Sequence, residues 1–323
     1  MTKSTVRPRL VSIVGQTATG KSALGLALAK KFNGEVVSCD STAVYRGFDI
    51  GTDKVSARLQ REVPHHLIDI AEPTDVYSAA RYARDANDVI RDISSRGKLP
   101  IVVGGTGLYY RALTRGLFPG PARDDRIRCQ LTSVSRRRGV EALHQMVTNI
   151  DEVSGERIQP RDEKRLVRAL EVFILTGRSL TDHFSETRSL IEDYLVLGFG
   201  LRLDAADIRR RVSVRVEKQF EAGLLEEVRR ALVSGVEEDA HPLRGLVYRQ
   251  VVEFFRGVRN ERSTRELIVQ ENIRYARRQL IWFRKEPNLR WILGSGEHCA
   301  TVAQVTACLL EAIELDADSK RTD

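Results

Sequence analysis

Short apolar runs alternate with helical patterns along the first 120 residues. Strands are predicted at 10–14, 35–39 and 101–103, where apolar residues follow one another, and helices at 22–32 and 77–96, where they recur every three or four positions. Strands that alternate with helices form parallel sheets with helices on both faces. This part of the chain is therefore predicted to be an α/β sheet domain.

Between residues 121 and 193 the strand patterns disappear and helical patterns take over. The clearest predicted helix runs from Glu163 to Thr176, and Gly177 marks its C-terminal end. We therefore expect a helical insertion at 121–193 in a core domain formed by residues 1–120 and 194–323.

The core pattern returns after the insertion. A strand is predicted at 194–201, followed by one long amphipathic helix at 207–232 whose first turns also carry Arg211 and Arg215. A last amphipathic helix is predicted at 265–284, with arginines along a second face. These elements complete the sheet and add basic helices to it.

The segment between the first strand and the first helix has the phosphate-binding pattern G-x-x-x-x-G-K-[ST]. Its residues are Gly15, Gln16, Thr17, Ala18, Thr19, Gly20, Lys21 and Ser22. The glycines allow backbone N–H groups to face a diphosphate, the lysine neutralises phosphate oxygens, and the Ser22 hydroxyl can bind Mg²⁺, the expected cofactor. Kinases, GTPases and prenyltransferases can all use such a loop, because it recognises only phosphate.

Two further candidates follow the second and third strands. Asp40 lies at the C-terminal end of its strand, the edge where open parallel sheets bind ligands, and it can act as a base for a hydroxyl or an amine. An aspartate that forms an Asx turn after the strand fits the same position. Thr106 lies in a glycine-rich segment that allows close approach of a ligand, but this segment alone also fits a tight turn.

Composition narrows the partner and the compartment. Lys and Arg outnumber Asp and Glu by 52 to 44, giving a formal net charge of +8, which favours a polyanion such as nucleic acid, although a basic enzyme without such a partner fits too. No apolar run reaches the roughly 18 residues that span a bilayer, and no signal-peptide core precedes the first strand, so we expect a cytoplasmic protein. The four cysteines lack paired spacing and are expected to be reduced.

Taken in order, these and other segments resemble the bacterial tRNA dimethylallyltransferase family, also called tRNA isopentenylpyrophosphate transferase. The resemblance covers nearly the whole chain and is far more specific than the phosphate loop alone. The matching segments are GQTATGKS at 15–22, DSTAVYRGFDIGTDK at 40–54, PHHLID at 64–69, YSAARY at 77–82, VVGGTGLYYRAL at 102–113, RLVRALEV at 165–172, RVEKQFEAGLLEEV at 215–228, VYRQ at 247–250 and YARRQLIWFRK at 275–285.

The resemblance implies a P-loop NTPase-like parallel sheet flanked by helices, with an inserted helical tRNA-binding domain. It also implies the reaction, in which N6 of the adenosine directly 3′ of the anticodon attacks the allylic carbon of dimethylallyl diphosphate and expels pyrophosphate, with Mg²⁺ present. In this family Asp40 would be the base at N6, and Thr106 would contact the adenosine or the donor. Arg215 would join the phosphate loop and compensate charge on the leaving group.

The partner implied by the resemblance is the anticodon stem-loop of tRNA, from which the adenosine must be flipped out. The protein is expected to act as a monomer and without a membrane. The residues expected to contact the RNA are Asp40, Ser41, Thr42, Ala43, Thr106, Arg123, Arg128, Lys164, Arg165, Arg168, Arg249, Gln250, Arg274, Arg277, Arg278 and Gln279.

Several positions depart from the family pattern while the phosphate loop matches it. They are Thr42, Ala43, Val247, Asn272, Ile273 and Ile281. Thr42 and Ala43 remove an amide side chain that could contact a neighbouring base, so these departures affect the expected RNA contacts and not the donor site.

Two other functions remain as alternatives. A small-molecule P-loop kinase would need a clamp for the nucleotide base and a mobile arginine-rich lid, and the segment 123–138 resembles such a lid. A non-catalytic RNA-binding protein would use the basic helices but would leave the phosphate loop and Asp40 without a function.

Overall fold

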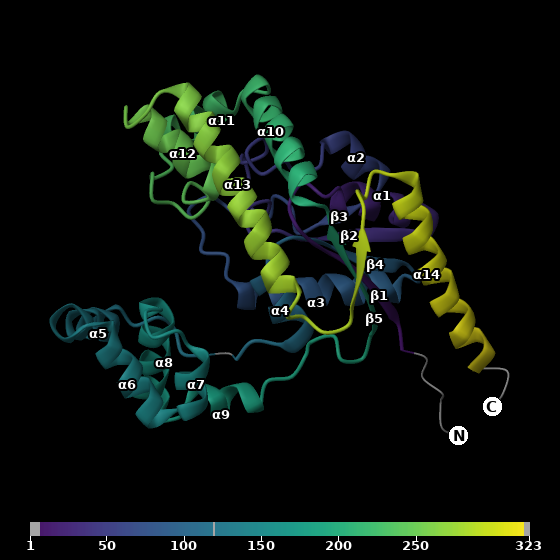
Figure 1. Ribbon diagram of the computed structural model, residues 1–323. Helices are drawn as coiled ribbons and strands as arrows, with labels where there is room; N and C mark the ends of the chain where they lie inside the picture. Colours follow the sequence, from purple (N-terminus) through teal and green to yellow (C-terminus); the bar gives the residue numbers. More distant parts are fainter. Residues whose placement is uncertain (1–6, 119, 320–323) are drawn as a thin grey trace. The chain divides into compact units, whose positions relative to one another are not determined.

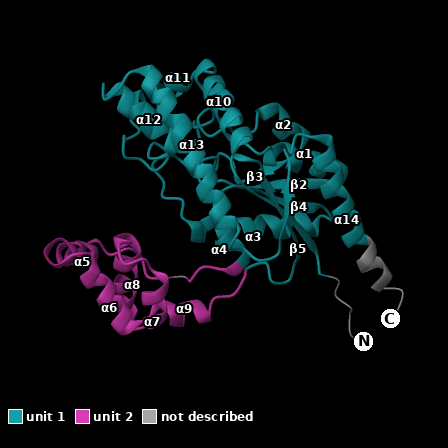
Figure 2. Ribbon diagram, viewed as in Figure 1, with its two compact units in different colours: residues 1–114, 190–323 teal, residues 115–189 magenta. Residues whose placement is uncertain are grey.

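The computed structural model describes residues 7–118 and 120–319 of the chain. The chain divides into two compact units (Figure 2), a core unit of residues 1–114 and 190–323 and a helical unit of residues 115–189. The helical unit begins and ends a few residues before the predicted bounds of 121 and 193. The backbone at Gly116 lies so close to that of Arg188 that a Cβ at Gly116 would be 2.1 Å from the Arg188 oxygen, which brings the entry and exit segments into one unit.

The core unit is built on one parallel sheet. Within the described residues the sheet has six strands in the order β3-β2-β4-β1-β5-β6, and all neighbouring strands are parallel (Figure 1). The strands are β1 (Arg9–Gly15), β2 (Gly34–Cys39), β3 (His65–His66), β4 (Leu99–Gly104), β5 (Leu195–Arg202) and β6 (Leu289–Leu293). The predicted sheet is confirmed. The two edge strands were not predicted, because β3 has two residues and β6 is too exposed to show a continuous apolar run.

Helices cover both faces of this sheet. Val11 and Ile13 of β1 pack with residues of α1 and α14, whereas Leu10 and Val14 pack into the cluster formed by α3, α4 and α10–α13. Figure 1 shows these helices around the sheet. Successive residues of a strand point to opposite faces, so a continuous apolar strand needs both layers. The helices are α1 (Lys21–Lys31), α2 (Ala57–Glu62), α3 (Ala79–Ser95), α4 (Gly107–Arg115), α10 (Ala205–Glu221), α11 (Leu224–Val233), α12 (Leu246–Phe255), α13 (Glu261–Phe283) and α14 (Cys299–Ser319).

The single long helix predicted at 207–232 is wrong. The chain forms two helices there, α10 and α11, because Gly223 adopts a left-handed conformation with φ of +96°. Glycine enters this region without steric cost and thereby ends the helical pattern. The break turns the chain and allows α11 to pack against both α10 and α12.

The helical unit has its own apolar core. Leu143 and Val147 pack against Leu166 and Leu170, and all four are buried. The helices are α5 (Asp125–Arg138), α6 (Val140–Ile150), α7 (Glu152–Arg157), α8 (Glu163–Thr176) and α9 (Leu180–Ser185). In the described part of the chain no helix is both long and apolar enough to cross a membrane.

A buried carboxylate joins α5 and α8 within this unit. Glu171 accepts two hydrogen bonds from Arg128, at 2.8 and 2.9 Å, one from Arg168 at 2.7 Å and one from the backbone N–H of Asp124 at 2.8 Å. Burial acts to raise the pKa of Glu171, but the hydrogen bonds from the two arginines outweigh it and lower the pKa to about 2. The stability of the helical unit therefore depends on the ionised form of Glu171.

Replacing Glu171 with alanine should leave two arginines facing each other without a counter-ion. We expect the free energy of unfolding to fall by about 2 kcal/mol, less than for a fully buried pair because the arginines are about one-third exposed. Urea unfolding followed by circular dichroism measures this change. The matched control is Glu186→Ala, since Glu186 pairs with Arg178 at the exposed surface and should contribute little.

The same group gives a pH dependence with a defined sign. A carboxyl whose pKa is lowered by folding stabilises the protein above its unfolded pKa of about 4.3, and the contribution is lost as the pH falls toward about 2. The difference in stability between the wild type and Glu171→Ala should therefore shrink between these pH values. A difference that stays constant over this range would contradict the assignment.

Candidate active site

Two glycines allow the phosphate loop to bend between β1 and α1. Gly15 has φ of +128°, and a Cβ there would lie 2.2 Å from the backbone oxygen of Leu201 in β5. Gly20 has φ of +81°, and a Cβ there would lie 3.0 Å from the backbone nitrogens of Gly296 and Glu297. Both positions require glycine because of conformation and space, which agrees with the pattern found in the sequence.

Side chains hold the phosphate loop in place. Gln279 on α13 accepts a hydrogen bond from the Thr17 N–H at 2.6 Å and donates one to the backbone oxygen of Gly105 at 2.9 Å. Thr19 donates its hydroxyl proton to the backbone oxygen of Gln16 at 2.8 Å. The loop is therefore tied both to itself and to the turn that follows β4.

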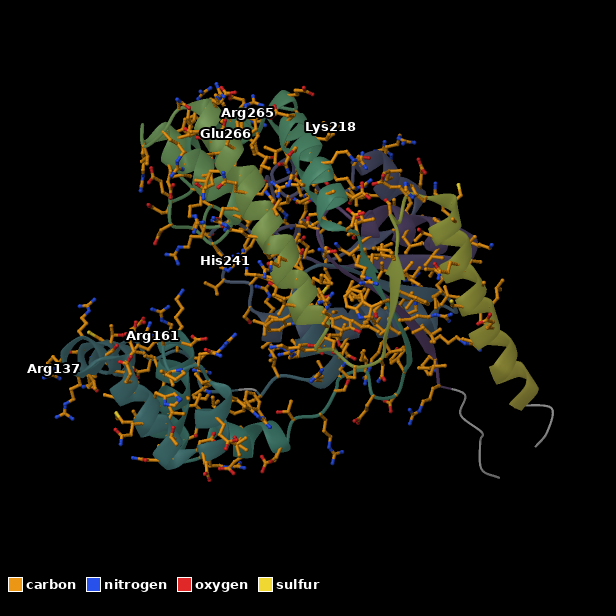
Figure 3. All side chains as sticks on the ribbon, viewed as in Figure 1. Arg137, Arg161, Lys218, His241, Arg265 and Glu266 are labelled. Atoms are coloured by element: carbon orange, nitrogen blue, oxygen red, sulfur yellow. The ribbon has the colours of Figure 1, made fainter. Side chains whose placement is uncertain are left out.

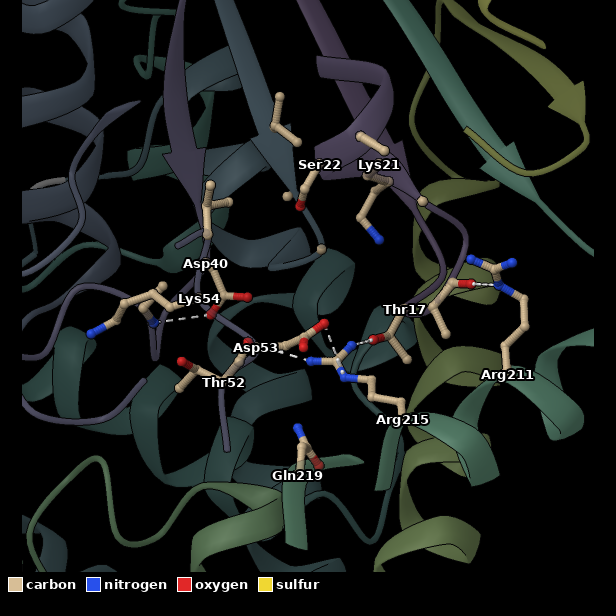
Figure 4. A pocket seen from close by; sticks show the side chains of 18 of the residues that line it. Thr17, Lys21, Ser22, Asp40, Thr52, Asp53, Lys54, Arg211, Arg215 and Gln219 are labelled. Atoms are coloured by element: carbon tan, nitrogen blue, oxygen red, sulfur yellow. Dashed lines mark hydrogen bonds and ion pairs between the residues drawn. The ribbon is translucent and has the colours of Figure 1, made fainter. Parts of the chain in front are cut away.

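Two cations point into the space beside the loop (Figure 4). Lys21 Nζ donates to the backbone oxygen of Gln16 at 2.5 Å. Arg215 on α10 donates to Thr17 Oγ1 at 2.9 Å and to the backbone oxygen of Thr52 at 3.3 Å. Burial, together with the positive charge of Arg215, lowers the pKa of Lys21 to about 7. The arrangement favours an anionic ligand, which would relieve the repulsion between the two cations.

Asp40 forms the Asx turn that was considered for it. Its Oδ1 accepts hydrogen bonds from the Thr42 N–H at 2.9 Å, from the Thr42 hydroxyl at 2.7 Å and from the Ala43 N–H at 3.3 Å. This Asx turn fixes the carboxylate while the residue also lines the cavity that contains Lys21. Oδ2 receives no hydrogen bond from the described residues, so it is the oxygen that can accept a proton from a ligand.

Thr106 supports the turn that carries Asp40. Its Oγ1 accepts a hydrogen bond from the Ser41 N–H at 3.0 Å and donates to Ser41 Oγ at 3.3 Å. Of the glycine-rich segment, Gly104 and Gly105 line the cavity and Thr106 does not. The structure therefore brings Thr106 to the edge of the site, one residue away from the cavity wall.

Tyr275 on α13 is a cavity residue that the sequence analysis did not single out. Burial and the negative charge of Asp40 raise the pKa of Tyr275 to about 12. Its hydroxyl therefore stays protonated and can donate a hydrogen bond to a ligand. One tyrosine among the arginines of a helix gives no signal of this kind, because its position depends on how α13 packs over the sheet.

The cavity has a volume of about 850 Å³, within the range of small-molecule and cofactor sites. Its walls come from the phosphate loop, the ends of β2 and β4, the segment 49–55, α10 and α13. The polar lining includes Lys21, Ser22, Asp40, Asp53, Arg210, Arg211, Arg215, Lys218, Tyr275 and Gln279, and the apolar lining includes Ile50, Val55, Ile68, Val103 and Val214. Cationic, acidic and apolar groups thus face one space.

The segment 49–55 is held by a second residue that the sequence did not reveal. Glu227 on α11 is 4% exposed and accepts hydrogen bonds from the N–H groups of Asp49 and Ile50, both at 2.8 Å, and of Gly51 at 3.1 Å. The hydroxyl of Tyr248 donates to the same carboxylate at 2.7 Å. A carboxylate that accepts several backbone N–H groups fixes their conformation, so Glu227 shapes this wall of the cavity from outside it.

Several of the residues expected to contact RNA have hydrogen-bond partners within the protein. Gln250 is buried and accepts a hydrogen bond from Arg259, Gln279 holds the phosphate loop, and Thr42 holds Asp40. Arg128 and Arg168 are paired with Glu171. Their hydrogen bonds give these residues structural roles, which a search for basic residues in the sequence cannot distinguish from binding roles.

Asp40, Ser41, Ala43 and Thr106 are buried or half-buried in the turns that follow β2 and β4, whereas the remaining candidates are exposed. On the core unit they are Arg249, Arg274, Arg277 and Arg278, and on the helical unit Arg123, Lys164 and Arg165. Arg137 and Arg161 also extend from the surface of the helical unit (Figure 3). Two of the positions that depart from the family pattern have a structural role. Asn272 donates to the backbone oxygen of Ile268 at 2.9 Å, and Val247 lies in the apolar core.

Comparison with known proteins identifies the family. The family model for IPP transferase matches residues 43–286. The tRNA dimethylallyltransferase of Geobacter sulfurreducens is 43% identical over 286 residues, which cover 88% of this chain and 92% of the relative. The tRNA dimethylallyltransferase 2 of Geotalea daltonii is 38% identical over 320 residues, covering 99% and 97%.

The fold agrees with these relatives. The crystal structure of the full-length tRNA isopentenylpyrophosphate transferase from Bacillus halodurans superposes with a TM-score of 0.72 at 33% identity, covering 97% of this chain and 99% of that one. The P-loop parallel sheet, the anion site beside it and these comparisons define a transferase of the P-loop class. The chain belongs to the IPP transferase family.

The pKa of Lys21 leads to a test of the anion site. Binding of pyrophosphate beside Lys21 should raise this pKa, so Lys21 should take up a proton on binding, and this uptake should be larger at pH 8 than at pH 6. Calorimetric titrations in buffers with different ionisation enthalpies measure the uptake. Lys21→Arg is the control, because an arginine stays charged throughout. Equal uptake by both proteins at pH 8 would contradict the position assigned to the ligand.

Proposed function

We propose that this protein transfers the dimethylallyl group of dimethylallyl diphosphate to N6 of the adenosine directly 3′ of the tRNA anticodon. The bond between the allylic carbon and the diphosphate oxygen breaks, the bond from N6 to that carbon forms, and pyrophosphate leaves. N6 then loses a proton, which Asp40 accepts and passes to solvent. The proposal is supported by the relatives, which are named tRNA dimethylallyltransferases.

One observation carries the proposal. A carboxylate with a free oxygen, Asp40, and a pair of cations, Lys21 and Arg215, face the same cavity. A nucleophile that must lose a proton needs the first, and a diphosphate leaving group that gains charge needs the second. The Gly15–Ser22 loop would hold the diphosphate, and the apolar side chains opposite would face the prenyl group.

The tRNA would bind through its phosphates and present one base to the cavity. The adenosine must leave the stack of the anticodon loop, which costs a few kcal/mol that contacts elsewhere have to offset. The exposed arginines of α13, with Arg249 and the basic residues of the helical unit, are suited to those contacts because they are charged and accessible. Tyr275 can donate a hydrogen bond to the base.

Mg²⁺ fits the oxygen groups present. Ser22 is exposed at the first turn of α1 and lines the cavity, and its hydroxyl together with diphosphate oxygens forms the kind of ligand set that Mg²⁺ prefers. When bound, the ion would neutralise charge on the pyrophosphate. We further propose that the protein works as a monomer in the cytoplasm.

A small-molecule kinase is the weaker hypothesis. The relatives are transferases that act on tRNA by name, and no kinase is among those reported above. The arginine-rich segment 123–138, considered as a lid, contains helix α5, whose Leu131 packs into the apolar core of the helical unit. A kinase would transfer the γ-phosphate of ATP to an acceptor, whereas the proposed reaction leaves ATP unchanged.

Mass spectrometry of tRNA nucleosides tests the proposal. After incubation with dimethylallyl diphosphate and Mg²⁺, tRNA with an adenosine at the required position should contain N6-prenylated adenosine. Asp40→Asn should lower kcat by about 100-fold or more, because asparagine keeps the Oδ1 acceptor of the Asx turn but cannot take the proton. Affinity for pyrophosphate should change little. Absence of the modified nucleoside with the wild-type protein would refute the proposal.

The RNA surface gives a separate test. Arg277→Ala should raise the KM for tRNA with little change in kcat, and it should lower the salt dependence of binding by about one counter-ion. Arg290→Ala is the control, since Arg290 is exposed near the start of β6, at the sheet edge away from the cavity. Equal effects of the two substitutions on KM would show that α13 has no special part in RNA binding.

A further inference from the structure

An acidic side chain lies inside the group of cations that would bind the diphosphate. Asp53 lines the cavity, and its Oδ2 is 3.3 Å from Nε of Arg215 (Figure 4). The other two nitrogens of this guanidinium donate to Thr17 and Thr52. All three nitrogens of Arg215 therefore have oxygen partners, and Asp53 is the only one of the three with a charge.

The backbone that carries Asp53 is fixed while its side chain can move. Glu227 holds the N–H groups of residues 49–51, and Lys54 forms ion pairs with Asp49 at 2.6 Å and Asp69 at 2.5 Å. Asp53 has φ of +57°, and its side chain is 60% exposed. The residue is therefore held beside Arg215, but its carboxylate can rotate into solvent at small cost.

A carboxylate at this position disfavours the binding of a ligand with two phosphates. Like charges in one site repel each other. When a diphosphate binds, Asp53 must therefore either break its ion pair with Arg215 or bind a metal ion together with the diphosphate. The direct contact is with the arginine, which favours the first possibility. The ion pair also stabilises Arg215, which is only 24% exposed, while no ligand is bound.

We propose that Asp53 is an exchangeable counter-ion of Arg215 that competes with the diphosphate and thereby speeds release of the pyrophosphate product. This inference rests on the proposed function for its meaning in the reaction, although the competition itself is a property of the anion site. Asp53 is a positioning residue here, since it acts on the ligand through Arg215.

Asp53→Asn tests the proposal without a change of shape. Asparagine is tolerated at positive φ at least as well as aspartate, so the variant should fold. Its affinity for inorganic pyrophosphate, measured by calorimetry without and with Mg²⁺, should rise by about five-fold, the upper range for a partly exposed ion pair. The gain should shrink as the salt concentration rises.

Two controls separate this pairing from a general effect of charge. Asp49→Asn removes the same charge from the same segment, but Asp49 pairs with Lys54, so pyrophosphate affinity should change less than two-fold. In the Arg215→Ala background the gain from Asp53→Asn should disappear, because the partner for which it competes is absent.

Each outcome decides the question. An affinity that is unchanged in Asp53→Asn, a gain that persists without Arg215, or an equal gain in Asp49→Asn would overturn the proposal. Weaker binding of Asp53→Asn only when Mg²⁺ is present would overturn it as well, by identifying Asp53 as a metal ligand. Prenylated adenosine is measured separately by mass spectrometry, so failure of the proposed reaction is distinguishable from failure of the competition.

Discussion

Lys21 and Arg215 place two basic side chains in one cavity, and the repulsion between their charged forms is the constraint on which the site depends. It is one cause, after burial, of the lowered pKa of Lys21. Fixed oxygens hold both groups, namely the backbone oxygens of Gln16 and Thr52 and the hydroxyl of Thr17, while the mobile carboxylate of Asp53 pairs with Arg215. The cations are therefore already oriented toward the space where an anion would lie, and binding requires little reorganisation.

Residues on helices far away in the sequence hold the walls of this cavity in place. Gln279 on α13 connects the phosphate loop with the turn after β4, and Glu227 on α11 fixes the cavity wall formed by the segment 49–55. Gln219 on α10 donates to the backbone oxygens of Ile50 and Gly51 and so holds that wall from a second side. The helices that cover one face of the sheet thus also determine the shape of the cavity.

Sequence patterns predicted the parts of the site that depend on the geometry of nearby residues. The glycines at 15 and 20 are required by backbone conformation and close approach, and the position of Asp40 follows from the edge of a parallel sheet, so both could be inferred from the sequence. Glu227, Tyr275 and the pairing of Arg128 with Glu171 could not, because they depend on contacts between residues tens to hundreds of positions apart.

The Asx turn explains how acidic and basic groups share one cavity without neutralising each other. The negative charge of Asp40 acts to raise the pKa of Lys21, yet its Oδ1 bonds to Thr42 and Ala43, and no hydrogen bond joins Asp40 to Lys21 in the described residues. The charges stay separate, with a proton acceptor on one side and an anion site on the other. A reaction that moves negative charge from a nucleophile to a leaving group gains most from such a separation, because the stabilisation grows toward the transition state.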